Sequence, residues 1–223
     1  MRINFWNRLG SLKNQLLAVL SFAILIASGQ AYSQDKWSAE PMTLPNAPDA
    51  GFYKDDYYIG NLDARVVIIE YASLTCPHCA NFHVNFLPSL KKDFVDTGKV
   101  LFVFRDFPLD EYAFQATMIA QCAPRDSYFA ILDQLFTNQQ TWVRAENISD
   151  ALDGFAQNIG IDSEKLTSCY ADEKSIDRTV YLYTEAYNKY GVRGTPSLVI
   201  NGQLKSGFRT YEELQGFLNS LLK

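Results

Sequence analysis

Two cysteines separated by two residues are the feature of this sequence that could do chemistry: Cys76, Pro77, His78 and Cys79 form a Cys-x-x-Cys motif. Two thiols at this spacing can close a small disulfide ring and exchange it with other thiols. Zinc sites use the same spacing, but a structural zinc site needs four ligands and the chain has no second motif of this kind. The only histidines are His78 and His83. We therefore interpret the motif as a redox pair and predict no metal site.

The residues around the motif predict which cysteine is reactive. Residues 65–72 are an apolar, largely β-branched run, typical of a strand buried on both faces. After a short turn, Cys76 takes the N-cap position of a helix and Pro77 the first helical position, where its missing N–H costs nothing. A thiol at this end of a helix lies beside unpaired N–H groups and the positive end of the helix dipole. Cys76 is therefore the predicted thiolate, and Cys79 lies one turn further in.

The segment after the motif predicts a helix that leads into a second strand. Its apolar residues recur at a spacing of four: Phe82, Phe86, Leu90 and Phe94. Proline disrupts helical hydrogen bonding and glycine commonly ends helices, so we expect a kink at Pro88 and the end of the helix at Gly98. Residues 100–107 form a second apolar run. Strand, helix and strand together predict a right-handed βαβ unit.

The remainder of the chain predicts an inserted helical region and a C-terminal hairpin. In residues 109–190 the apolar residues recur at helical spacing, which predicts about four helices and no strand. Asn201 and Gly202 then form a typical hairpin turn. The last predicted elements are two short strands and a closing helix: 197–200, 203–208 and 210–222. This order predicts an α/β domain with an inserted helical subdomain.

The N-terminal residues indicate export. Three basic residues precede a 12-residue apolar run at 16–27, and small polar residues follow it. This pattern is typical of a secretory signal peptide, which we assign to residues 1–33. A membrane-spanning helix needs about 20 apolar residues, so an uncleaved anchor is the alternative. Residues 34–57, rich in Pro, Asp and Ala, are predicted to be an extended lead-in.

The composition excludes several classes of protein. The chain has 223 residues, of which 48% are hydrophobic and 20% charged, which is a normal balance for a globular protein. Its net charge is −5 and it has no run of Lys and Arg, which argues against nucleic acid as a partner. Four cysteines are too few for a disulfide-dense scaffold, so the individual thiols need explanations of their own.

Several of these features resemble the DsbA-like thiol:disulfide oxidoreductases of the thioredoxin superfamily. Glu70 stands six positions before Cys76, a helical insertion follows the motif, and residues 194–196 (Gly-Thr-Pro) precede an apolar strand and Asn-Gly. Residues 105–108 (Arg-Asp-Phe-Pro) and the Gly-Thr-Pro segment look most like the α-proteobacterial branch of DsbA. The resemblance covers nearly all of the chain after the predicted signal peptide.

The resemblance implies a thioredoxin fold with an inserted helical subdomain. Residues 58–108 and 191–223 would form the thioredoxin-like domain, and 109–190 the subdomain. The implied activity is the introduction of disulfides into folding secreted proteins in the periplasm, by a monomer without a cofactor. A quinone-linked membrane thiol oxidase would regenerate the disulfide. A disulfide isomerase or reductase with the same motif is one alternative, and a non-catalytic peptide-binding module is another.

The resemblance also implies roles for residues around the motif. Glu70 would be the buried carboxylate that moves protons to and from Cys79, and His78 would stabilise the Cys76 thiolate. Arg105, on the neighbouring strand, is a candidate partner for Glu70. We expect His83 to be a half-exposed helix residue and leave it out of the site.

Two further pairs of residues complete the predicted site. Thr195 and Pro196 occupy the place of the superfamily's cis-proline loop, where the backbone of Thr195 would pair with an extended substrate peptide. Cys122 and Cys169 lie in the helical insertion, and free thiols would be a liability in an exported protein. We expect them to form a structural disulfide, as is known among the α-proteobacterial relatives.

Overall fold

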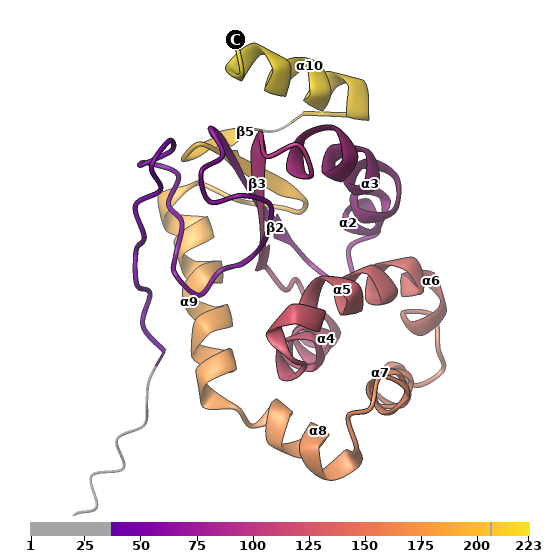
Figure 1. Ribbon diagram of the computed structural model, residues 1–223. Helices are drawn as coiled ribbons and strands as arrows, with labels where there is room; N and C mark the ends of the chain where they lie inside the picture. Colours follow the sequence, from indigo (N-terminus) through magenta and orange to yellow (C-terminus); the bar gives the residue numbers. More distant parts are fainter. Residues whose placement is uncertain (1–36, 206) are drawn as a thin grey trace, which may run out of the picture. The chain divides into compact units, whose positions relative to one another are not determined.

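The computed structural model describes residues 37–205 and 207–223, so the predicted signal peptide lies outside the described residues. Within that range, no helix has the length and apolar character needed to cross a membrane. The centre of the fold is a five-stranded sheet with the strand order β1-β3-β2-β4-β5 (Figure 1). The strands are β1 (Tyr57–Ile59), β2 (Val66–Ala72), β3 (Val100–Asp106), β4 (Ser197–Ile200) and β5 (Gln203–Lys205).

The two apolar runs of the sequence form the central strands. Every residue of β2 and β3 is buried, and the two strands pair in parallel, which confirms the predicted βαβ unit. β4 pairs antiparallel to β2 and is joined to β5 by the predicted hairpin. Asn201 and Gly202 form its turn with φ angles of 46° and 78°, a conformation that these two residue types tolerate.

The helix after the motif is divided into four segments. These are α2 (Pro77–Asn81), a π-helical segment η1 (Phe82–Phe86), α3 (Leu87–Leu90) and a second π-helical segment η2 (Lys91–Val95). The two π-helical segments lie on either side of Pro88, where the sequence predicts a kink. Such π-helical turns often occur at functional sites. Gly98 follows the helix with a φ of 73°, as expected for a glycine that ends one.

The inserted region contains six α-helices and one 3₁₀ turn, so the expectation of about four helices is wrong. Several of these helices have four to ten residues, too short to show a clear period in the sequence. Residues 109–190 contain no strand. The helical elements are α4 (Glu111–Cys122), η3 (Arg125–Ser127), α5 (Tyr128–Thr137), α6 (Gln139–Trp142), α7 (Ile148–Asn158), α8 (Ser163–Tyr170) and α9 (Glu173–Lys189).

The sheet is covered on both faces. Residues of β2 and β3 with even numbers, such as Ile68 and Phe104, pack against the motif helix, α5 and the C-terminal helix α10 (Tyr211–Leu221). Those with odd numbers, such as Ile69 and Val103, pack against α9 and the lead-in segment. Figure 1 shows α9 and the lead-in on one side of the sheet, with α2 and α3 on the other. The motif therefore faces the even-numbered side.

The lead-in has more structure than the sequence indicates. Its described part, residues 37–56, buries Leu44, Phe52 and Tyr53, and it runs into the edge strand β1, which the sequence analysis did not predict. β1 pairs antiparallel with β3 and covers the edge that this strand would otherwise expose.

Candidate active site

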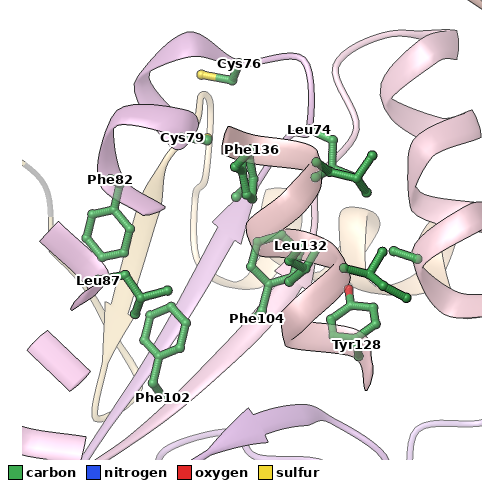
Figure 2. Close-up of a cluster of buried hydrophobic side chains, with 14 of the residues drawn as sticks. Leu74, Cys76, Cys79, Phe82, Leu87, Phe102, Phe104, Tyr128, Leu132 and Phe136 are labelled. Atoms are coloured by element: carbon green, nitrogen blue, oxygen red, sulfur yellow. The ribbon is translucent and has the colours of Figure 1, made fainter. Parts of the chain in front are cut away.

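Cys76 lies at the N-cap of α2, with Pro77 at the start of the helix. The N-cap backbone is extended (φ −77°, ψ 120°), so the cysteine ends the turn after β2 rather than joining the helix. Cys76 is 7% exposed and Cys79 is fully buried. In this structure the two cysteines are free thiols. Figure 2 shows Cys76 at the outer end of the motif helix and Cys79 close to the apolar core.

The surroundings of Cys76 favour its thiolate form. Hydrogen bonding from the Cys79 thiol is the main cause that lowers the pKa of Cys76 from its ordinary value of 9.0 to about 5, and burial opposes it. The side chain of Thr195 and the backbone N–H groups of Cys79 and His78 lower the pKa of Cys76 further. Backbone N–H groups at the start of a helix point at an anion placed there. Cys76 is therefore the thiol that ionises at neutral pH.

His78 contributes to this environment through its backbone. His78 is exposed, and its backbone N–H is among the groups that lower the pKa of Cys76. The structure records no contact between the imidazole and the Cys76 sulfur among the described residues. The role predicted for the His78 side chain therefore stays a prediction.

Cys79 has the opposite electrostatic environment. Burial is the main cause that raises its pKa, followed by its hydrogen bond to Cys76 and by the negative charges of Glu70 and Cys76. A thiol in such a place keeps its proton unless a nearby group removes it. The two cysteines are thus divided into one thiolate and one protonated thiol.

Glu70 lies in the middle of β2, on the face that carries the motif helix, and is fully buried. Its Oε2 lies 2.8 Å from Nε2 of His83. His83 is 4% exposed and its ring stacks on Phe136 with the ring centroids 4.1 Å apart. The expectation that His83 is a half-exposed helix residue is therefore wrong. Because His83 follows the buried Cys79 by four positions, the two share one helix face, and this spacing could have identified it.

The proposed pairing of Arg105 with Glu70 is also wrong. Glu70 lies opposite Phe104 in the strand register, whereas Arg105 lies opposite Tyr71. Since neighbouring residues of a strand point to opposite faces, Arg105 projects to the far side of the sheet. There its guanidinium contacts Asp56 at 2.7 Å and Glu185 at 3.1 Å, and it ties the lead-in to β3 and α9.

The loop before β4 lies directly against the thiolate position. The Thr195–Pro196 peptide bond is cis. In its thiol form, Sγ of Cys76 donates a hydrogen bond to the carbonyl oxygen of Thr195 at 3.3 Å. This contact brings together residues 119 positions apart in the sequence.

Gln139 is a further residue at the site, and the sequence does not predict it. It is 1% exposed, at the start of α6, and its Nε2 donates to the carbonyl oxygens of Leu74 at 2.8 Å and Cys76 at 2.9 Å. The inserted helices thereby hold the turn that presents the thiolate. A glutamine in the polar segment 138–140 carries no sequence signal for this role.

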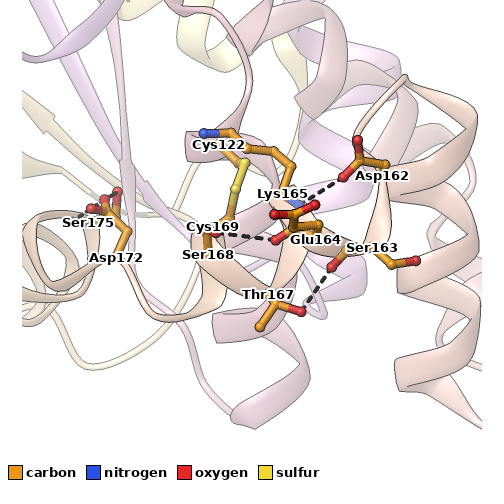
Figure 3. The surroundings of a disulfide bond; sticks show 10 residues. All are labelled: Cys122, Asp162, Ser163, Glu164, Lys165, Thr167, Ser168, Cys169, Asp172 and Ser175. Atoms are coloured by element: carbon orange, nitrogen blue, oxygen red, sulfur yellow. Dashed lines mark hydrogen bonds between the residues drawn. A yellow bond between two sulfur atoms is a disulfide. The ribbon is translucent and has the colours of Figure 1, made fainter.

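The other two cysteines are joined within the insertion. A disulfide links Cys122 at the end of α4 to Cys169 in α8, with the Cα atoms 5.5 Å apart and a sequence separation of 47 (Figure 3). The described residues contain no group of three His, Cys, Asp or Glu side chains that could hold a metal ion.

Comparison with known proteins assigns the chain to a family. The family described as thioredoxin matches residues 53–220. A Wolbachia pipientis protein, α-DsbA1, has a crystal structure that is 30% identical with a TM-score of 0.69, covering 76% of this chain and 92% of that one. A Rickettsia bellii protein named "Putative protein-disulfide oxidoreductase" is 32% identical over 67% of this chain and 58% of its own length. A Bacillus cereus protein named "Probable disulfide bond formation protein D" is 28% identical over 86% of this chain and 90% of its own length.

The fold, the helix-terminal Cys-x-x-Cys motif and the cis-proline loop agree with these similarities. The chain spans little more than half the length of the Rickettsia relatives that it matches. It belongs to the thioredoxin family, among the DsbA-like proteins.

Proposed function

We propose that this chain is an exported thiol:disulfide oxidoreductase that introduces disulfides into folding proteins in the periplasm. The observation that carries the proposal is the asymmetry of the two motif thiols. The pKa of Cys76 is lowered to about 5, while that of Cys79 is raised. Stabilising the Cys76 thiolate stabilises the reduced form of the protein, and a protein whose reduced form is stable is an oxidant. The names of the Rickettsia and Bacillus relatives support the same activity.

The reaction proceeds by two thiol exchanges. A substrate thiolate attacks Sγ of Cys76 in the oxidised protein; the Cys76–Cys79 bond breaks, and its electron pair and then a proton go to Cys79. A second substrate thiolate attacks the substrate sulfur of this mixed disulfide, and Cys76 leaves as a stabilised thiolate. The substrate loses two electrons and gains a disulfide, and the motif gains both electrons as thiolate and thiol. A quinone-linked membrane thiol oxidase, expected from the family, removes these electrons again.

The remaining site residues take supporting roles in this proposal. The backbone of Thr195, beside the cis Pro196, pairs with an extended segment of the unfolded substrate and places it over Cys76. Glu70 exchanges a proton with Cys79. The Cys122–Cys169 disulfide is structural and holds α4 to α8 throughout the cycle.

The test is oxidation of a reduced, unfolded protein whose own activity returns only when its disulfides form. The oxidised wild-type chain is expected to restore that activity in stoichiometric amounts, and Cys76→Ser to restore none. Cys79→Ser, with Cys76 first converted to a mixed disulfide with glutathione, is expected to exchange glutathione for a substrate thiol and to accumulate a mixed disulfide between Cys76 and the substrate. The matched control is the double variant Cys122→Ser, Cys169→Ser, which has equally lost two cysteines and is expected to retain transfer.

The same assay separates the alternative activities. If the chain instead acts mainly on a substrate with wrongly paired disulfides, the isomerase alternative replaces the oxidase. A different outcome would make the chain a peptide-binding module and not an oxidoreductase. In that outcome the oxidised wild-type chain transfers no disulfide, and the double variant Cys76→Ser, Cys79→Ser still binds unfolded peptides.

A further inference from the structure

We propose that His83 carries protons between the buried Glu70–Cys79 pair and solvent, through a pocket on the side of the motif helix that faces α5. The inference rests on the proposed function, because it concerns the proton that Cys79 gains and loses in each cycle. It assigns a role in proton transfer to a residue that the resemblance to DsbA does not include.

The need for a relay follows from burial. Cys79 changes between disulfide and thiol, so one proton must reach its sulfur or leave it each time. Both Cys79 and Glu70 are fully buried. The charge of Glu70 acts on Cys79, which makes Glu70 the group proposed to exchange a proton with it, and neither side chain is exposed to bulk water. A third group must connect the carboxylate to solvent.

His83 has the geometry for this connection. Its Nε2 lies 2.8 Å from Oε2 of Glu70, while its Nδ1 is buried and has no hydrogen-bond partner among the described residues. An imidazole can accept a proton at one ring nitrogen and release one from the other. The ring is fixed between two aromatic neighbours, stacked on Phe136 and edge-on to Phe104 with centroids 5.4 Å apart. The unpartnered nitrogen is thus held in a defined direction.

A pocket of about 390 Å³ provides the access to solvent, and His83 forms part of its wall. Lys91 of η2 and Asp133 of α5 also line it. Burial raises the pKa of Asp133, and charge on His83 lowers it, so these two side chains interact electrostatically. The ionisable groups around His83 are Glu70 of β2, which is bonded to it, and Asp133 of α5 and Lys91 of η2, which line the same pocket; Cys79 of α2 precedes it by four positions. Polar groups at the pocket wall can hold the water that exchanges protons with Nδ1.

The proton balance is simple. When the Cys76–Cys79 bond breaks, the electron pair stays on Cys79, and Glu70 supplies a proton to that sulfur. A proton from pocket water enters at Nδ1 of His83, and the Nε2 proton passes to Glu70. One proton thus enters for each disulfide delivered, and the reverse path removes it when the motif is reoxidised.

The pocket is separate from the loop that is proposed to bind the substrate. Cys76, Thr195 and Pro196 are not among its lining residues. A substrate peptide bound over the cis-proline loop would shield the thiolate from water, whereas the pocket beside α5 would remain open. Proton exchange and substrate binding can therefore occur at the same time.

The experiment follows the reaction of the reduced protein with oxidised glutathione in single turnover. In the first step Cys76 attacks and forms a mixed disulfide. In the second, Cys79 loses its proton, attacks Cys76 and releases glutathione. His83→Gln retains a group able to hydrogen-bond to Glu70 but cannot titrate. It is expected to slow the second step about 100-fold, the usual scale of general acid–base catalysis, and to leave the first step unchanged. Asn85→Gln, an exposed position in the same π-helical segment, is the matched control.

Two further measurements keep a structural effect apart from a relay. In His83→Ala, imidazole added to the buffer is expected to restore the second step in a concentration-dependent manner. In wild type, D₂O is expected to slow the second step more than the first. A second step in His83→Gln as fast as in Asn85→Gln, or a loss in His83→Ala that imidazole leaves unchanged, would overturn the relay. Failure of wild type to form the mixed disulfide at all would instead refute the proposed function.

Discussion

The titration of Cys76 is by itself predicted to lower the free energy of unfolding of the reduced protein as the pH falls from 9 to 5. The folded state lowers the pKa of this thiol from 9.0 to about 5, so folding favours its thiolate. A difference of one pKa unit between folded and unfolded states corresponds to about 1.4 kcal/mol. The stabilisation is therefore complete above the unfolded pKa, at about 5 kcal/mol, and it is lost as the pH falls towards the folded pKa. Near neutral pH about half of it, roughly 3 kcal/mol, remains.

The same quantity sets the oxidising strength of the motif. The thiolate stabilises only the reduced form, because a disulfide does not titrate. Since about 1.4 kcal/mol equals about 30 mV for a two-electron couple, the Cys76 thiolate is expected to raise the reduction potential by roughly 60 mV at neutral pH.

The assay is urea unfolding of the reduced and the oxidised protein at a series of pH values between 5 and 9. The free energy of unfolding of the reduced form, less that of the oxidised form, is expected to rise by about 1.4 kcal/mol per pH unit. Reduced Cys76→Ser serves as the control and is expected to lose this slope. Titration of the thiolate's ultraviolet absorbance gives the folded pKa independently. A slope of zero in reduced wild type, or a folded pKa at the ordinary value for cysteine, would refute the reasoning.

Three other substitutions test contacts that hold the active site and the surrounding fold in place. Gln139→Ala removes the side-chain donor from the carbonyl oxygens of Leu74 and Cys76 and is expected to cost about 1–3 kcal/mol in urea unfolding, mainly at Leu74, because the Cys76 oxygen keeps its bond from the Ala80 N–H; an unchanged midpoint would contradict this role. Asp56→Asn removes the charge that faces buried Arg105 and is expected to cost about 3 kcal/mol, whereas a stability equal to wild type would show that Glu185 suffices. Replacing Cys122 and Cys169 with serine is expected to cost up to about 4 kcal/mol while leaving the Cys76 pKa in place, and a shifted thiolate titration would argue against a purely structural disulfide.

Local signals in the sequence were sufficient for the parts of the fold that build the motif. Residues 65–72 predict β2 because an uninterrupted apolar run has few alternatives to a strand buried on both faces. Pro77 marks the start of α2 because it tolerates only the first helical positions. The Asn201–Gly202 turn has φ angles that few other residue pairs accept.

The sequence was insufficient wherever the outcome depends on register or on long-range contacts. Whether Arg105 faces Glu70 depends on the strand register, and a shift of one position reverses the face of every side chain. His83 is buried because the π-helical segment and the aromatic ring of Phe136 enclose it. Gln139 reaches a turn more than 60 positions away, which no local pattern reports.

The inserted helical region is connected to the sheet at one end of its strands. β2 and β3 are parallel, so both finish at the end where the motif begins. β4 starts at the same end, with Ser197 opposite Tyr71. Both junctions of the insertion therefore flank Cys76, while the strand pairing that positions Glu70 lies behind them. The strand pairs therefore do not depend on the length of the insertion. The thiol pair does depend on two of its helices, because Phe136 of α5 stacks on His83 and Gln139 of α6 holds the turn at Cys76. Changes of length in the insertion are thus tolerated only where they leave α5 and α6 in place.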